Sequence, residues 1–188
     1  MRRSVEEAMA GRLGMAKFSD IPQLTREGSW ECGFCIDRVW AFIREQEAAD
    51  GAVDVDPDFQ RPHRWTESQQ IAWIEFFLRG GKTGRVLYFN HFGWCRYRTG
   101  ILTLVDGKQR LEAIRRFVGN EIPAFGHIWS EYVDHPDLIR HSIKINVNTL
   151  ETRAEVIQWY IEMNAGGTPH SKAEITHARE LLRREVSK

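Results

Sequence analysis

The sequence predicts one domain in which helices and strands are mixed along the chain. Its 188 residues are 42% hydrophobic and include seven tryptophans, which is enough for a single folded domain with a hydrophobic core. An apolar run at 101–105 stops at Asp106-Gly107, and an amphipathic run with Leu111, Ile114 and Phe117 on one face follows it. This change of period indicates a strand, a tight turn and a helix.

We interpret residues 1–52 as an N-terminal arm followed by a helix. Residues 1–30 are weakly patterned, and we expect them to wrap the domain or to contact a second copy of the chain, as in a homodimer. Cys32 and Cys35 have no second pair at the spacing of a four-ligand zinc site, which favours reduced, buried thiols over a metal or redox site. Residues 36–49 carry apolar side chains on one helical face.

The segment from Val53 predicts a short strand, a loop and a helix. The loop is stiffened by prolines and carries Gln60 and Arg61, and functional groups often lie on such loops. A capping box at 66–69 opens the helix, which we expect to end at Gly80.

Residues 86–89 and 101–105 are predicted strands that fit a hairpin. Their connection carries aromatic residues together with Arg96 and Arg98, which fall on one face of an extended segment. Basic and aromatic side chains together suit a nucleic-acid backbone and its bases. A hairpin tip without a ligand explains the same residues.

The last third of the chain predicts an irregular segment, a strand and two helices. The expected elements are an irregular stretch at 126–141, a strand at 142–147, a helix at 151–163, a glycine-rich turn at 164–169 and a helix from 171 to about 184. Consecutive N–H groups in the glycine-rich turn can form an anion-binding nest. No internal repeat is present, so we expect residues 53–188 to form one domain.

Charge and cysteine content limit the classes of function. Lys and Arg number 26, and Asp and Glu also number 26, so contact with nucleic acid requires a local basic patch. No apolar run has the length of a membrane span, and the first residues lack the core of a signal peptide. An odd number of cysteines argues against a secreted disulfide framework. We therefore expect a cytoplasmic protein with no membrane partner.

The turn from Asp106 to Arg110 concentrates chemical groups. A helix that starts at Lys108 presents unpaired N–H groups and a partial positive charge to an anion such as phosphate. Arg110 can grip the same anion with its guanidinium fork, and Asp106 can hold a metal ion through water or orient a hydroxyl. An ordinary strand–helix turn, with Asp106 as the cap and Arg110 solvated, explains the same residues.

Three motifs follow one another in the chain. They are Phe59-Gln60-Arg61-Pro62-His63-Arg64-Trp65, Val105-Asp106-Gly107-Lys108-Gln109-Arg110-Leu111, and Asn164-Ala165-Gly166-Gly167-Thr168-Pro169 with Ser171 and Glu174. Together they resemble the FQRPYVW, DGQQR and N-x-G-G-x-x-L-S-x-x-E motifs of the N-terminal domain of GmrSD-type restriction endonucleases, in the ParB/sulfiredoxin-like superfamily. The match runs from about Val53 to Glu180. The resemblance implies a compact α+β domain with a small mixed sheet flanked by helices.

The resemblance also implies a set of site residues. It assigns catalysis to Asp106, Gln109 and Arg110, with Asp106 as the ligand of a Mg²⁺ ion. Nucleotide binding falls to Gln60, Arg61, Gly107, Lys108, Asn164 and Gly167. Lys108 stands where the family usually has glutamine, which either strengthens phosphate binding or removes an amide that positions water. Long family members continue into an HNH-type nuclease region, so we expect a standalone copy that does not cut DNA by that route.

Three functions follow as hypotheses. The first is a nucleotide-binding domain that hydrolyses a nucleoside triphosphate with Mg²⁺ in a restriction, anti-restriction or phage context. The second is a DNA-binding or DNA-nicking ParB-like nuclease that contacts phosphates through Arg96, Arg98, Arg115 and Arg116. The third is a non-enzymatic protein that modulates a defence complex.

Overall fold

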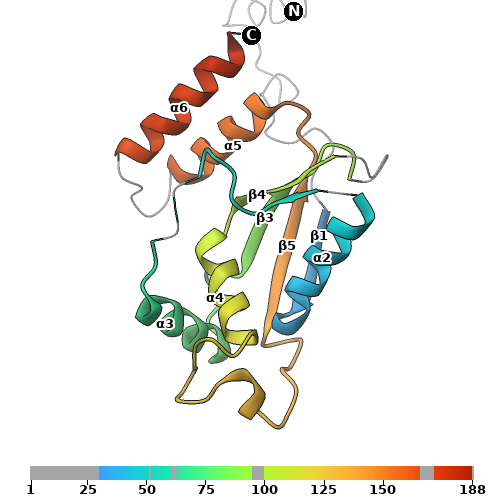
Figure 1. Cartoon of the computed structure of the whole chain (residues 1–188), viewed down its shortest axis with the longest axis vertical. Helices are drawn as coiled ribbons and strands as arrows, with labels where there is room; N and C mark the ends of the chain where they lie inside the picture. Colours follow the sequence, from blue (N-terminus) through green and yellow to red (C-terminus); the bar gives the residue numbers. More distant parts are fainter. Residues whose placement is uncertain are drawn as a thin grey trace, which may run out of the picture.

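The computed structural model describes residues 30–50, 52–60, 62, 64–94, 100–165 and 172–187. Over these ranges the chain forms five α-helices, two short 3-10 helices and one five-stranded sheet (Figure 1). The mixed α+β class is confirmed. The predictions for the arm at 1–29, for Arg61, for Arg96 and Arg98, and for Gly167 lie outside the described residues.

The sheet has the strand order β1-β5-β3-β4-β2. Its strands are β1 (Trp30–Cys35), β2 (Val53–Asp54), β3 (Val86–Asn90), β4 (Leu102–Asp106) and β5 (Ser142–Asn148). β1 pairs with β5 and β3 pairs with β4 antiparallel, whereas β5 and β3, and β4 and β2, are parallel. The sheet is therefore mixed, and the predicted pairing of β3 with β4 is confirmed.

The helices agree closely with their sequence signals. They are α2 (Val39–Asp50), which follows the 3-10 turn η2 (Ile36–Arg38), α3 (Glu67–Leu78), α4 (Lys108–Val118), α5 (Arg153–Ala165) and α6 (Lys172–Val186), and a second 3-10 turn, η3, spans Trp129–Glu131. The capping box of α3 is confirmed, since the Gln69 N–H donates to Thr66 Oγ1 over 3.3 Å and the Thr66 N–H donates to Gln69 Oε1 over 2.9 Å.

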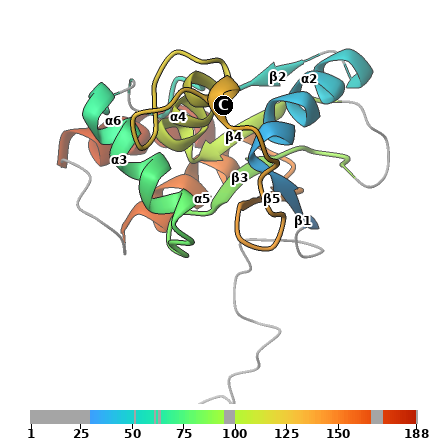
Figure 2. The ribbon, with the colours of Figure 1, turned by 90° about the horizontal axis from the view of Figure 1, so that it is seen from below.

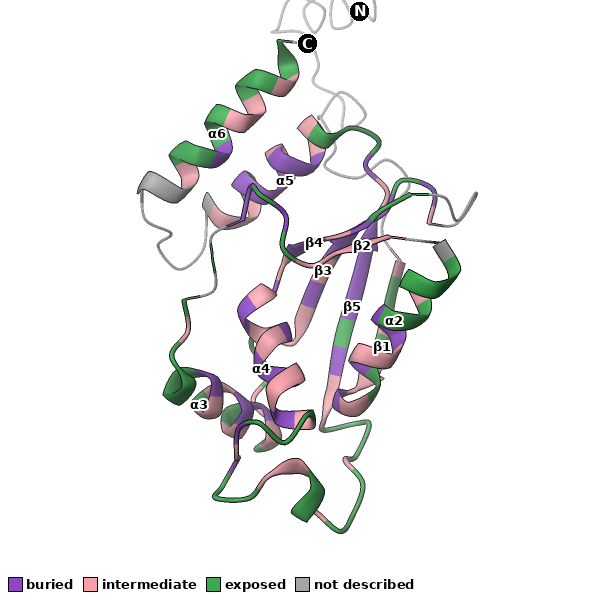
Figure 3. Cartoon of the chain, in the orientation of Figure 1, coloured by how far each residue is buried: buried purple, intermediate pink, exposed green. Residues whose placement is uncertain are grey.

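The two faces of the sheet pack against different helices. Successive residues of a strand point to opposite faces, so Leu104 of β4 joins the main core with α2, α3 and α4, whereas Val105 joins a second core with α5 and α6. Figure 2 shows α2 and α4 on one side of the sheet and α5 on the other. In Figure 3 the middle strands are largely buried between these layers.

The strand β1 is the main element that the sequence analysis did not predict. It pairs along its whole length with β5, from Trp30 opposite Val147 to Cys35 opposite Ser142. Cys32 and Cys35 are half-buried, not fully buried as expected. Residues three apart in a strand point to opposite faces and lie about 10 Å apart, which is too far for a disulfide.

Candidate functional site

The candidate site is the turn between β4 and α4. Gly107 is the N-terminal cap residue of α4 and has a φ of 113°, a conformation that favours glycine. A Cβ atom at this position would lie 2.5 Å from Leu87 Cδ2 on β3. No side chain caps α4 at Gly107, so Asp106 is not the cap that the ordinary interpretation requires. The start of this helix is therefore suited to an anion.

Arg110 is folded back over the sheet. Its Nη1 donates to the carbonyl oxygen of Val86 over 2.8 Å, and its Nη2 forms an ion pair with Asp106. The side chain of Arg110 is only 15% exposed, compared with 34% for Asp106. Arg110 is thus not a solvated side chain, and its guanidinium group is held beside the turn by one carboxylate and one carbonyl.

Lys108 is held by an acid from a different part of the chain. Its ammonium group forms an ion pair with Asp56, in the loop that follows β2. The side chain of Lys108 is 14% exposed, whereas that of Asp56 is 73% exposed. The cation is therefore well positioned at the turn, while its carboxylate partner lies on a surface loop.

Two amides attach the first motif to this turn. Gln109 Oε1 accepts hydrogen bonds from the backbone N–H groups of Arg64 and Trp65, each over 2.9 Å. Gln60 Nε2 donates to the carbonyl oxygen of Leu104 over 2.5 Å. Both glutamines are largely buried, and these bonds position the backbone on either side of Arg61.

The third motif begins in α5, which packs against the loop of the first motif. Asn164, in the last turn of α5, donates through Nδ2 to the carbonyl oxygen of Tyr160 over 2.6 Å. The ring of Tyr160 lies 5.4 Å from that of Phe59, the residue before Gln60. The first two motifs are therefore joined directly, and the first motif also contacts α5, the helix in whose last turn the third motif begins.

Asp58 also links this loop to the C-terminal helices. Its carboxylate pairs with Arg153 of α5, and its carbonyl oxygen lies 3.2 Å from His177 Nε2 of α6. Neither Asp56 nor Asp58 was singled out as a site residue by the sequence analysis. The available signal was the run of acids at 54, 56 and 58, which by itself does not identify their cationic partners.

The two arginines at the other end of α4 belong to an acidic cluster. Arg115 pairs with Glu112 over 2.8 Å and with Glu121 over 2.5 Å, and Arg116 pairs with Glu67 over 2.7 Å. Hydrogen bonds to Glu112 and Glu67 raise the pKa values of Arg115 and Arg116, respectively, and the hydrogen bond from Arg115 lowers the pKa of Glu121. Two cations thus face three carboxylates, which weakens any attraction for a nucleic-acid phosphate.

The described side chains near the turn can bind a magnesium ion only together with oxygen ligands from a bound phosphate and from water. Among the residues that the structure describes, no group of three or more His, Cys, Asp or Glu side chains could hold a metal. Mg²⁺ commonly uses one or two carboxylates together with phosphate oxygens and water. Asp106, which is partly exposed at the turn, can supply one such carboxylate.

Comparison with other proteins gives no family assignment. No family model, no curated protein and no solved structure matches this chain. Over the described ranges, no helix is long and apolar enough to cross a membrane.

Proposed function

We propose that this chain binds a nucleoside triphosphate at the start of α4 and hydrolyses it with Mg²⁺. The observation that carries the proposal is an uncapped helix start bordered by Lys108 and Arg110, to which Gln109 ties the backbone of the first motif at Arg64 and Trp65. A helix N-terminus, a lysine and an arginine are the groups that bind phosphates in proteins. The proposed setting is related to DNA, as the resemblance to GmrSD-type domains implies, and cytoplasmic, as the sequence pattern suggests.

In this proposal the phosphates of the nucleotide replace the carboxylates of Asp56 and Asp106 as the partners of Lys108 and Arg110. Lys108 leaves Asp56 and Arg110 leaves Asp106, so each cation trades one anion for another without remaining unpaired in a buried site. The released Asp106 carboxylate would be the protein group that holds Mg²⁺, and the ion would supply charge neutralisation at the phosphates. Positioning and charge neutralisation are the main requirements of phosphoryl transfer.

The amides have a positioning role. Gln109 holds the backbone of Arg64 and Trp65, and Gln60 binds the carbonyl oxygen of Leu104 in the middle of β4. We therefore propose that Gln109 shapes the phosphate site instead of contacting the reacting atoms.

The DNA-contact hypothesis is weaker for Arg115 and Arg116 because three carboxylates already offset their charge. The hypothesis of a non-enzymatic interaction protein assigns no role to the turn between β4 and α4. It becomes the better explanation if nucleotides do not bind.

A pair of variants tests the proposal. Lys108→Ala and Asp56→Ala break the same ion pair, so a purely structural role predicts equal, small losses of stability and no change in nucleotide binding. A phosphate role predicts opposite effects. We expect nucleotide affinity to fall by about tenfold in Lys108→Ala and to rise in Asp56→Ala, because a competing anion is removed.

The measurement is calorimetric titration with each common nucleoside triphosphate and Mg²⁺, followed by phosphate release with and without DNA. Asp106→Asn should retain binding and lose turnover. Equal affinities in the two ion-pair variants would contradict a phosphate site at α4. Absence of binding by the unaltered chain would favour the interaction-protein hypothesis.

A further inference from the structure

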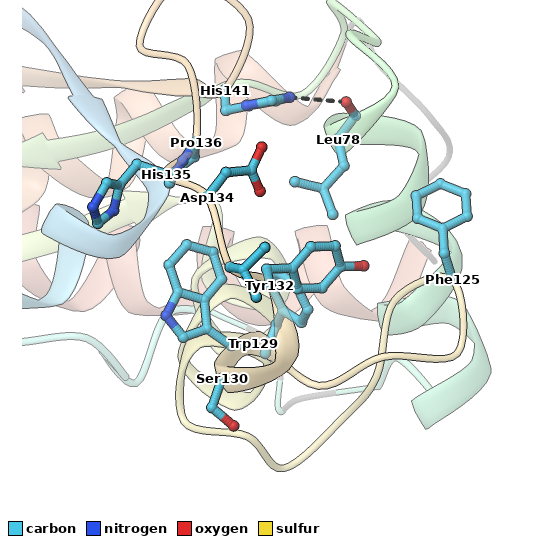
Figure 4. A pocket seen from close by; sticks show the side chains of 11 residues that line it. Leu78, Phe125, Trp129, Ser130, Tyr132, Asp134, His135, Pro136 and His141 are labelled. Carbon is cyan, nitrogen blue, oxygen red and sulfur yellow. Dashed lines mark hydrogen bonds between the residues drawn. The ribbon is translucent and has the colours of Figure 1, made fainter.

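A pocket of about 490 Å³ lies beside the far end of α4. Its lining comes from the end of α3, from Phe117 of α4, from Phe125, and from η3 and the irregular segment after it. Figure 4 shows Trp129, Tyr132, Phe125 and Leu78 around the space. The volume and the apolar lining are typical of a small-molecule site.

The aromatic walls of the pocket are held in place by their neighbours. The rings of Trp129 and Tyr132 both pack edge-on against Phe117, with centroids 5.5 Å and 6.1 Å from it. The Tyr132 hydroxyl donates to the carbonyl oxygen of Ala124 over 2.7 Å. Phe117 is fully buried. These contacts orient two electron-rich rings before any ligand arrives.

The described residues that line the pocket include one carboxylate, Asp134, and two histidines, His135 and His141. The carboxylate of Asp134 points into the space between Trp129 and Leu78 (Figure 4). Burial, together with the carboxylates of Glu75 and Glu131, raises the pKa of Tyr132. The described residues that line the pocket include no lysine or arginine.

His141 is held by backbone groups on both sides of its ring. The Asp137 N–H lies 3.0 Å from His141 Nδ1, and Nε2 lies 3.0 Å from the Leu78 carbonyl oxygen. Both ring nitrogens are therefore engaged within the protein and are not directed at a ligand.

We propose that this pocket binds a small organic cation that carries an aromatic or other flat apolar body. The body lies against Trp129, Tyr132 and Phe125, and the ammonium group lies near Asp134 and the ring faces. Aromatic faces attract cations, and the attraction grows as water is excluded. An anion of the same shape is disfavoured by the Asp134 carboxylate.

The pocket is separate from the nucleotide site of the proposed function. Lys108 and Phe117 lie nine positions apart on one helix, which corresponds to about 14 Å along its axis. The inference therefore stands or falls independently of nucleotide binding.

The test uses two probes with the same ring and opposite charge, tryptamine and indole-3-propionate. The full chain is titrated with each while backbone amide resonances are followed by NMR. We expect tryptamine to bind with a dissociation constant on the order of 1 mM or tighter, to shift resonances of η3 and residues 132–135, and to bind about tenfold more tightly than the anion.

Variants separate charge from shape. Asp134→Asn, at an exposed position, should remove the preference for the cation, and Phe125→Ala should weaken binding of both probes. Glu45→Gln, an exposed acid on α2, is the matched control and should change neither. Equal affinity of the unaltered chain for the two probes, shifts outside the pocket, or absence of binding would overturn the proposal.

Discussion

The two ends of α4 carry similar residues in different arrangements. At its start, Lys108 pairs with Asp56 and Arg110 pairs with Asp106, and Asp56 is a highly exposed loop residue. Near its end, Arg115 and Arg116 share three carboxylates, with Glu121 bound to both. In the proposed function the start exchanges a carboxylate for a phosphate, whereas the described groups at the end have an excess of negative charge.

This difference shows that the number of lysine and arginine side chains in a region does not by itself identify an anion-binding site. What matters is how many carboxylates already hold each cation and how easily they leave. The predictions below first disrupt the helix that joins the two ends and then act on one end at a time.

Ile114→Ala should have the largest effect, because it disrupts the whole helix. Ile114 is fully buried in the main core at the middle of α4. We expect the free energy of unfolding to fall by ~2–5 kcal/mol through lost burial and an internal cavity. Denaturant unfolding measures this change, and a loss below about 1 kcal/mol would contradict the observed packing of α4.

Gly107→Ala should damage only the start of the helix. The positive φ and the 2.5 Å approach of a Cβ to Leu87 Cδ2 predict a loss of about 2–3 kcal/mol. Nucleotide affinity should fall while binding of tryptamine persists. Gly80→Ala is the control, because Gly80 also has a positive φ but no atom within 4 Å of its added Cβ. Equal free energies of unfolding for the two variants would show that the contact with Leu87 does not contribute to the loss of stability.

Gln109→Leu should act at the same end with a smaller effect. It leaves the N–H groups of Arg64 and Trp65 without the oxygen that they share, which we expect to lower stability by ~1–2 kcal/mol because these groups are only partly buried. Gln109→Glu retains an oxygen acceptor and should restore most of the loss. Thermal unfolding and nucleotide turnover are measured for both variants, and full stability of Gln109→Leu would exclude the positioning role.

Glu121→Gln tests the acidic end and should have the smallest effect. Arg115 lowers the pKa of Glu121 below its ordinary value of 4.5, so the ion pair stabilises the fold above that pH and the stabilisation disappears as the pH falls through the folded-state value. The variant should melt slightly earlier than the unaltered chain at pH 7. This difference should shrink in melting curves recorded below pH 4.5. A difference that stays constant with pH would show that the carboxylate does not act through its charge.

Much of the fold could be predicted because its signals are local. The capping box at Thr66 and the apolar face of Leu111, Ile114 and Phe117 each lie within one element, and both helices form as expected. The strand at Trp30–Cys35 lacked such a signal. It is an edge strand stabilised by pairing with β5, which lies more than a hundred residues later in the chain.

The candidate site was predicted in part for the same reason. The turn at Asp106 and Gly107 is visible as a break in hydrophobic period, and the first two motifs mark residues that the structure brings together. The nucleotide role of these residues and the resemblance to GmrSD-type domains remain predictions. The aromatic pocket had no sequence signal, because residues 126–141 have neither a helical nor a strand period.

By itself the sequence determined the strand, the glycine turn and the amphipathic helix at the centre of the chain, since backbone geometry and apolar period depend on neighbouring residues. Only the tertiary structure decided that Asp56 holds Lys108, that Gln109 holds the loop of the first motif, and that Phe117 supports two aromatic walls. The physical reason is that the charge and hydrogen bonding of a side chain depend on partners brought close by folding, and those partners are distant in the sequence.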